Sequence, residues 1–579
     1  MLPFCISECF NTRMQPDIAR TKASPALVTQ KSAQPLPRWA LMLLCAAYVL
    51  PGLFGRDPWK NADIASFGQM WSLALGDSTW FNLNIGGVAP TSGGVLPYWL
   101  GGLFIWLGQG WVDPALAARL PFAMVLATVL ALTWYATYNL AHTDAARPLP
   151  LAFGGEALPR DYARATADGA VLALIATLGL LQLGHETTPE LLQLLGSTGF
   201  LYGLSAMDRH PRQAAIAALL SLPMLASSGS PTVAQLMGLV GILVCARSKH
   251  PHRWRQLAFV VAAMALAAGT TLSLQALDSA RWPWKVSEHL ALSSFAQLLL
   301  WFTWPALPLA MLTWWHWRRQ LQRRHMAVPS LIFFSVALAS LAMGADQQAL
   351  LMALPALAVL AAFALPILLR GLGAAIDWFS VLFFSLVALY IWLAYSAMHT
   401  GQPARLSANL LKRVPDYVPD FSWFALVLAI VGTLAWLALV RWRTARQSHA
   451  MWKSLVLPAG GVTLSWLLLL TLLLPLLDQG RSHRLLLERV GSQLPKGALV
   501  CAPGAPPAIL TALAYFGQHR VDGRLDATAQ SPRCEWMVQR LTAETRSQQI
   551  PGWKKMGVYN QRTANSEKLV LYRRLRSAQ

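Results

Sequence analysis

The sequence has little charge and little cysteine for its length. Of its 579 residues, 13% are charged and 55% are hydrophobic, whereas soluble domains carry about 25% charged residues. The mean hydropathy is +0.42. The six cysteines show no Cys/His spacing typical of a metal site. This composition favours a membrane protein and gives no indication of a zinc-binding module.

Several catalytic signatures are also missing. The sequence contains no GxxxxGK[ST] phosphate loop, no HExxH and no GxSxG. Their absence argues against an ATP-driven pump, a zinc protease of the HExxH type and a serine hydrolase. We also find no solenoid-type repeat and no low-complexity tract.

The net charge is +21. Nucleic-acid-binding proteins also carry such a surplus of positive charge. Here, however, the Lys and Arg residues lie in short segments between apolar runs, as the positive-inside rule for membrane proteins requires. We therefore expect membrane lipids among the partners, and no nucleic acid.

Long apolar runs recur along most of the chain. A spanning helix needs about 20 mostly apolar residues. Thirteen runs are candidates, with approximate limits 38–54, 115–141, 168–184, 190–207, 213–227, 231–246, 255–276, 293–316, 327–344, 347–369, 375–397, 422–441 and 454–476. The first run follows a polar, basic segment without a cleavage site, so it is interpreted as an uncleaved span. Met14 is an alternative start of the chain.

The positions of Lys and Arg predict the orientation. With thirteen spans, the basic segments all fall on one side of the membrane, which should be the cytoplasm. The chain is then a multi-pass protein of a bacterial inner membrane. Residues 1–37 form a cytoplasmic tail, 38–478 the membrane domain with a long periplasmic loop at 55–114, and 479–579 a periplasmic domain.

The composition changes after the last apolar run. Strand patterns occur at 498–503, 534–538 and 568–572, and a helical pattern occurs at 507–516. The predicted fold is therefore an all-α polytopic membrane protein of about 13 transmembrane helices with a small C-terminal α/β domain. If this domain lies in the periplasm, Cys501 and Cys534 could form a disulfide.

The long outward loop holds two candidate site elements. In DPWKNADIASFGQMW, Asp63 should begin a helix close to the membrane surface. Its alternative role is a helix cap, since Asp at a helix start accepts from free backbone N–H groups. In GGVLPYWLGG, Tyr98 and Trp99 follow flexible glycines. The alternative for this pair is an interfacial anchor helix.

Two further candidates lie at the outer ends of predicted spans. His185, Glu186 and Glu190 belong to HETTPELLQLL, between the third and fourth spans. Ionisable residues near membrane depth are costly and suggest function, although an acid in the first helical turn, such as Glu190, is also ordinary helix-start chemistry. Arg119 begins the second span. It could snorkel to the interface or bind a phosphate.

This order of elements resembles the C-type (GT-C) glycosyltransferases. It is most similar to bacterial relatives of the lipid A aminoarabinose transferase and of protein O-mannosyltransferases. Those proteins have an acidic motif after the first span, then a Pro-x-Tyr-Trp-like element, an Arg at the second span, and a second acid after the third. The sequence supplies Asp63, Leu96-Pro97-Tyr98-Trp99, Arg119, and Glu186 or Glu190 in that order.

The sequence departs from this pattern in two places. The family often has a tandem Asp-Glu where this chain has Ala62-Asp63-Ile64. The aminoarabinose branch carries a Lys just before its Tyr-Trp element, where this chain has Gly93, Gly94, Val95 and Leu96. The donor sugar and the phosphate contacts therefore need not be those of the aminoarabinose branch.

The resemblance implies a hexosyl or pentosyl transferase that uses a polyprenyl-phosphate sugar and a lipid, glycan or protein acceptor. Asp63 would orient or deprotonate the acceptor. Arg119, with Lys412 or Arg413 from a later outward loop, would stabilise the leaving phosphate. Glu186 with His185 would position the sugar or hold a divalent metal. A metal is possible in this reaction but is not required.

In the same resemblance, Tyr98, Trp99 and Glu190 would complete the substrate contacts.

Two other functions remain open. The chain could be a transporter or flippase of a lipid-linked glycan, although such proteins bring ionisable residues to the midplane and often contain inverted repeats. It could also be a catalytically inactive membrane scaffold.

Overall fold

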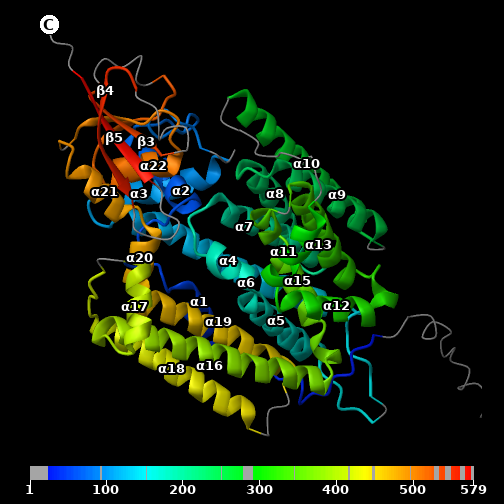
Figure 1. Ribbon diagram of the computed structural model, residues 1–579. Helices are drawn as coiled ribbons and strands as arrows, with labels where there is room; N and C mark the ends of the chain where they lie inside the picture. Colours follow the sequence, from blue (N-terminus) through cyan, green and yellow to red (C-terminus); the bar gives the residue numbers. More distant parts are fainter. Residues whose placement is uncertain are drawn as a thin grey trace, which may run out of the picture.

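The computed structural model describes residues 24–90, 94–151, 153–248, 251–277, 291–344, 346–414, 417–445, 450–495, 497–526, 534–541, 550–560 and 568–575. A bundle of helices forms most of this part of the chain, and a small sheet lies at one end of the bundle (Figure 1).

The helices occupy the chain up to residue 491. They are α1 (Arg38–Val49), α2 (Ala62–Leu75), α3 (Leu96–Leu107), α4 (Pro114–Ala141), α5 (Pro159–Ala176), α6 (Leu178–Leu183), α7 (Pro189–Ala206), α8 (Pro211–Ser227), α9 (Pro231–Arg247), α10 (Arg253–Ala276), α11 (Leu292–Phe302), α12 (Ala306–His316), η1 (Arg318–Gln320), α13 (Arg324–Ala342), α14 (Gln347–Leu351), α15 (Leu354–Ala362), η2 (Leu365–Ile367), α16 (Arg370–Thr400), α17 (Ala404–Arg413), α18 (Trp423–Thr444), α19 (Lys453–Leu472), α20 (Leu474–Arg481) and α21 (Arg484–Gly491). At least one helix lies in each of the thirteen predicted spans.

Several predicted spans are short or broken. Within the described residues, six helices are long and apolar enough to cross a membrane, namely α4, α10, α13, α16, α18 and α19. The pair α11 and α12, bent by 98°, adds a seventh if it forms one span. This bend falls at Pro305, which cannot donate a backbone hydrogen bond. The run at 347–369 is divided into α14, α15 and η2. The count of thirteen spans stays a prediction.

The buried centre of the bundle contains α5, α7, α15 and α19. By contrast, α16 and α18 expose large apolar side chains, including Phe379, Leu382, Leu386, Trp423 and Phe424. Exposed apolar surface of this extent is unusual for a soluble protein. A lipid bilayer is the environment in which such surface is stable, because hydrocarbon is as apolar as the side chains.

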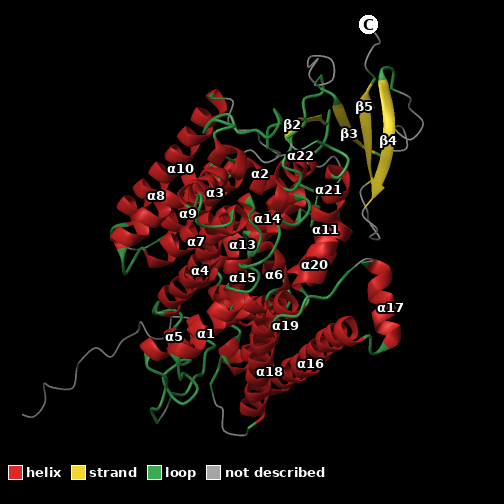
Figure 2. Cartoon of the chain, turned by 90° about the vertical axis from the view of Figure 1, so that its left-hand side faces the viewer, coloured by secondary structure: helices red, strands yellow, loops and turns green. Residues whose placement is uncertain are grey.

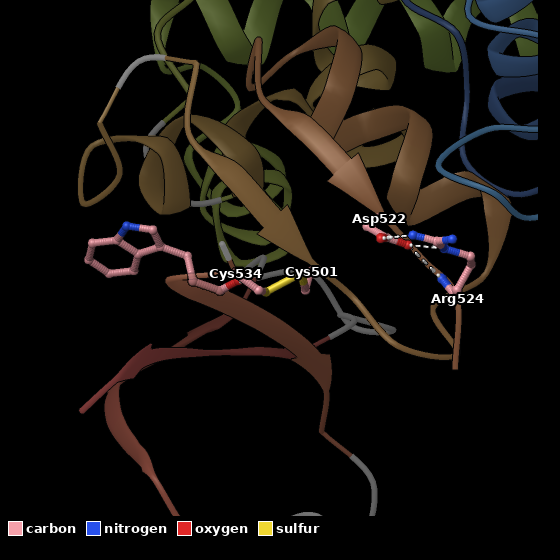
Figure 3. Close-up of a disulfide and its surroundings, with 5 residues drawn as sticks. Cys501, Asp522, Arg524 and Cys534 are labelled. Carbon is pink, nitrogen blue, oxygen red and sulfur yellow. Dashed lines mark hydrogen bonds and ion pairs between the residues drawn. A yellow bond between two sulfur atoms is a disulfide. The ribbon is translucent and has the colours of Figure 1, made fainter. Parts of the chain in front are cut away.

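The C-terminal domain contains the sheet. Its elements are β1 (Leu499–Cys501), α22 (Pro507–Tyr515), β2 (Arg520–Asp522), β3 (Trp536–Arg540), β4 (Trp553–Asn560) and β5 (Lys568–Arg574), and the strand order is β2-β1-β3-β5-β4. The first three strands in this order are parallel, and β5 pairs antiparallel with β3 and β4. A disulfide joins Cys501 at the end of β1 to Cys534 before β3, near the Asp522–Arg524 ion pair (Figure 3).

The predicted strands around residues 500, 536 and 570 and the predicted helix are present as β1, β3, β5 and α22. The strands β2 and β4 were not predicted. The first has only three residues, too few for a pattern. The second is an edge strand that exposes Lys554 and Lys555, and such charges protect edges from aggregation but remove the apolar alternation that sequence analysis needs.

The C-terminal domain packs on the long segment between α1 and α4 (Figure 2). Here α22 packs against α2, and the contact is so close that a Cβ added to Gly68 would lie 1.9 Å from Thr511 Oγ1. The Gly523 amide donates to the Gly86 carbonyl at 2.8 Å. The segment between α1 and α4 therefore forms the surface against which the C-terminal domain packs.

Candidate active site

Asp63 lies in the first turn of α2 but does not cap its own helix. Its Oδ2 accepts from the Trp59 amide at 3.0 Å and from Arg56 Nη2 at 3.4 Å. Its Oδ1 accepts from the Thr187 amide at 2.9 Å and from the Thr187 hydroxyl at 2.7 Å. The carboxylate thus ties the loop before α2 to the loop between α6 and α7.

The Arg56 guanidinium is the charge partner of Asp63. Both side chains are almost fully buried. Arg56 Nη2 also donates to the His185 carbonyl at 2.9 Å, and the guanidinium lies over the Trp59 ring, 4.6 Å from its centroid. Because these contacts hold Arg56 from three directions, its charge is fixed next to Asp63.

Asp63 is ionised at neutral pH. Burial by itself would raise the pKa of this carboxyl, but Arg56, Arg119 and the hydrogen bonds from Thr187 outweigh it, and the pKa is lowered. A carboxylate accepts about four hydrogen bonds, and Asp63 already accepts four.

Arg119, in the second turn of α4, is 5% exposed. It does not snorkel to the surface. Within the described residues it makes no hydrogen bond or ion pair, although Asp63, Asp113 and Asp478 attract it electrostatically. With His185 and Thr187 it lines a small cavity. The volume of this cavity is about 20 Å³, room for about one water molecule, and a buried guanidinium without a hydrogen-bonding partner is costly.

Both ring nitrogens of His185 lie close to backbone carbonyl oxygens. Its Nδ1 lies 2.7 Å from the Leu181 carbonyl and its Nε2 2.8 Å from the Tyr48 carbonyl. The ring also packs on Trp466 and Tyr48. Burial lowers the pKa of His185 to about 4, so the ring is neutral at pH 7. Both neighbours are acceptors, so the neutral ring, which carries one N–H, can donate to only one of the two carbonyls.

Glu186 lies beside Asp63 and is 8% exposed. Its Oε1 accepts from Gln182 Nε2 at 2.8 Å. Burial, together with the negative charge of Asp63, raises the pKa of Glu186 to about 7. In the described part of the chain, no three His, Cys, Asp or Glu side chains are grouped so as to hold a metal. We therefore find no donor set for a metal at His185 and Glu186.

Glu190 and Tyr98 face a larger cavity of about 470 Å³. Asp346, which was not among the predicted site residues, faces the same cavity and caps α14 through the Gln348 amide. Glu190 Oε2 is buried and accepts no hydrogen bond. The first turn of α2 and Pro507 of α22 complete the wall. The C-terminal domain is therefore part of the site.

The crystal structure of ArnT from Cupriavidus metallidurans in the apo state superposes with a TM-score of 0.60 and 14% identity, over 92% of this chain and 96% of that one. The chain has the GT-C fold. The crystal structure of the same ArnT bound to undecaprenyl phosphate gives a TM-score of 0.55 and 15% identity, over 93% of this chain and 97% of that one.

A third likeness is the cryo-EM structure of the arabinosyltransferase EmbB from Mycobacterium smegmatis, with a TM-score of 0.41, 14% identity, and coverage of 77% of this chain and 41% of that one. No protein-family model and no curated protein matches the sequence. The ArnT structures thus establish the architecture, and the chemistry of this GT-C chain is argued from its own residues.

The GT-C fold brings most of the predicted site residues to one end of the bundle. Trp99 lies there but faces the loop after α2, where its Nε1 donates to the Trp80 carbonyl at 2.6 Å. Lys412 is exposed on α17, and Arg413 ends that helix. This helix packs against α16 at the edge of the bundle (Figure 2). Lys412 does not line the cavities described above.

Sequence reasoning missed several polar residues that shape the site. Asp478, in α20, accepts from Trp59 Nε1 at 2.7 Å, and Arg481 lies over the same indole ring. Arg484 pairs with Asp57 at 2.9 Å. These contacts connect the loop before α2 to the segment that leads into the C-terminal domain. The acids in DPWKNAD were visible in the sequence, but Arg484, the partner of Asp57, lies 427 residues away, and Thr187, a partner of Asp63, lies 124 residues away.

Proposed function

We propose that this chain is a glycosyltransferase that moves a sugar from a polyprenyl-phosphate donor to a lipid, glycan or protein acceptor at the outward face of the membrane. The observation that carries the proposal is the position of Arg119. It is a buried cation without a hydrogen-bonding partner, beside an ionised carboxylate, at the end of an apolar bundle.

Arg119 would hold the phosphate of the donor. A guanidinium binds a phosphate with two parallel hydrogen bonds, and Arg119 has its donors available because no described residue accepts from them. The apolar flanks of the bundle would receive the polyprenyl chain. The same fold in ArnT has been solved with undecaprenyl phosphate bound, which supports a lipid phosphate as the ligand.

Two carboxylates would act on the acceptor. Asp63 would orient it, because its lowered pKa keeps it charged but makes it a weak base. Glu190 would accept the proton of the acceptor hydroxyl, because this residue lines the cavity and its Oε2 accepts no hydrogen bond within the protein. Tyr98 and Asp346 would contact the sugar from the other walls. The phosphate is already a good leaving group, so charge stabilisation by Arg119 replaces an acid.

The test is a transfer assay in proteoliposomes with radiolabelled polyprenyl-phosphate sugars and a membrane extract as the source of acceptor. Label that appears on a new product, and that depends on Glu190 in a Glu190→Gln comparison, supports the transferase. Label that crosses the membrane without a new product indicates a flippase, and no change in the label favours an inactive scaffold. A Glu190→Gln variant with normal rates would remove Glu190 from the reaction.

A further inference from the structure

A second large cavity lies at the end of the bundle opposite the sheet. Its volume is about 650 Å³, within the ~300–1,000 Å³ of typical ligand pockets. It is lined by the first turns of α16 and α19, the last turn of α18 and parts of 27–32. It is separate from the candidate active site, since α16 and α19 run between the two ends of the bundle (Figure 1).

The charged residues in this cavity are mostly basic. Among the described residues, Arg370, Arg443 and Lys453 line it together with one acid, Asp377, so three positive charges and one negative charge leave a net charge of +2. Arg443 forms an ion pair with Asp377. This pair is incomplete, because Arg443 Nε and Asp377 Oδ1 are buried without hydrogen-bond partners.

The backbone adds to the positive potential. The helices α16 and α19 both begin at the cavity, with Arg370 and Lys453 as their first residues. Neither N-terminus is capped by a side chain. The helix dipoles favour an anion at this end, although the Lys453 and Leu455 amides at the start of α19 donate to the Ala450 and Trp452 carbonyls. Arg370 makes no hydrogen bond or ion pair to any described residue, and its side chain is exposed.

Apart from Ser32, Thr444 and Ser454, the remaining side chains of the lining are apolar. Leu365, Leu368, Trp378, Val381 and Leu457 face the same cavity as the basic residues. Trp378 is 66% exposed, and its neighbour Phe379 is 51% exposed on the outside of α16. A small hydrophilic anion needs no such wall. An amphiphile does, because its headgroup can meet the cations while its chains follow the exposed face of α16.

We propose that this cavity binds the headgroup of an anionic phospholipid that carries two phosphates, such as cardiolipin, in the leaflet on the predicted cytoplasmic side. A headgroup charge of −2 matches the +2 of the cavity. Basic pockets between transmembrane helices on that side are suited to such headgroups. The site would stabilise the junction of α16, α18 and α19 from the end remote from the reaction.

The test uses the delipidated full-length protein in detergent, with tetraoleoyl cardiolipin as the probe and native mass spectrometry as the readout. A Lys or Arg at a membrane surface contributes about 1 kcal/mol per charge, or roughly fivefold in affinity. The double variant Arg370→Ala/Lys453→Ala should therefore bind cardiolipin roughly 25-fold more weakly. Arg441→Ala is the matched control, because Arg441 is exposed on the same last turn of α18 and does not line the cavity.

A gain-of-binding variant keeps the test valid if the double variant folds poorly. Asp377→Asn removes the only acid in the cavity and should bind cardiolipin about fivefold more tightly. Binding should fall from cardiolipin to phosphatidylglycerol to phosphatidylcholine. Equal binding of phosphatidylcholine, an equal loss in Arg441→Ala, or inorganic phosphate binding that replaces the preference for lipid would each overturn the proposal.

Discussion

Replacing Asp63 with Asn tests the centre of the candidate site. The substitution keeps the size of the side chain but removes its charge and turns one oxygen into an N–H₂ donor. Asp63 accepts two hydrogen bonds on each oxygen, so whichever oxygen is replaced, two donors lose their acceptor. Arg56, which is as deeply buried as Asp63, also loses its counter-charge.

The size of the effect follows from these contacts. Leaving one partner of a buried ion pair uncompensated costs about 3–5 kcal/mol, and this range includes most of the cost of the two unpaired donors. The loss falls on the loops before α2 and before α7, which carry the groups that face the cavity. We expect a lower unfolding temperature and a transfer rate reduced by about 10²-fold, the size of effect that a misplacement of the reacting groups by about 1 Å can have.

A second variant separates a structural role from a role in the reaction. Arg56→Gln added to Asp63→Asn removes the unpaired charge, so the double variant should regain much of the lost stability and none of the transfer. Both are measured in the proteoliposome assay and by thermal unfolding, with Asp77→Asn, an exposed acid of the same loop, as the control. Normal transfer by Asp63→Asn, or recovered transfer in the double variant, would refute the reasoning.

Three further predictions concern neighbouring residues. Arg119→Ala should raise the donor concentration needed for half-maximal transfer at unchanged stability; an unchanged requirement would assign the donor phosphate to another cation. The raised pKa of Glu186, about 7, means that the folded protein loses stability as pH rises from about 4.5 to 7, since the buried group must then ionise. Glu186→Gln should therefore raise the unfolding temperature at pH 8 more than at pH 5, and an equal change at both would contradict this pKa. Gly68→Ala should loosen the C-terminal domain, because its Cβ would meet Thr511 Oγ1 at 1.9 Å, whereas Gly480→Ala, with nothing within 4 Å, should not; limited proteolysis of the domain distinguishes the two.

Much of the architecture followed from local patterns. Apolar runs located the helices, because each run of this kind is stable only when it is buried or in lipid. The strands β1, β3 and β5 followed from short apolar segments that are buried in the sheet. The breaks at Thr177 and Pro305 were not predicted, because a hydropathy pattern measures composition and not the continuity of backbone hydrogen bonds.

The sequence by itself determined that this is a polytopic membrane protein with a small α/β unit at its end, and it marked Asp63, Arg119 and the Glu186–Glu190 region as candidates. Only the tertiary structure decided how these groups are used. In the folded protein, Asp63 accepts four hydrogen bonds, and both ring nitrogens of His185 lie against backbone carbonyls. Glu190 and Asp346 line the same cavity. Composition and hydrophobic periodicity depend on residues that are close together along the chain. The environment of a buried charged group, by contrast, depends on partners that can lie hundreds of residues away.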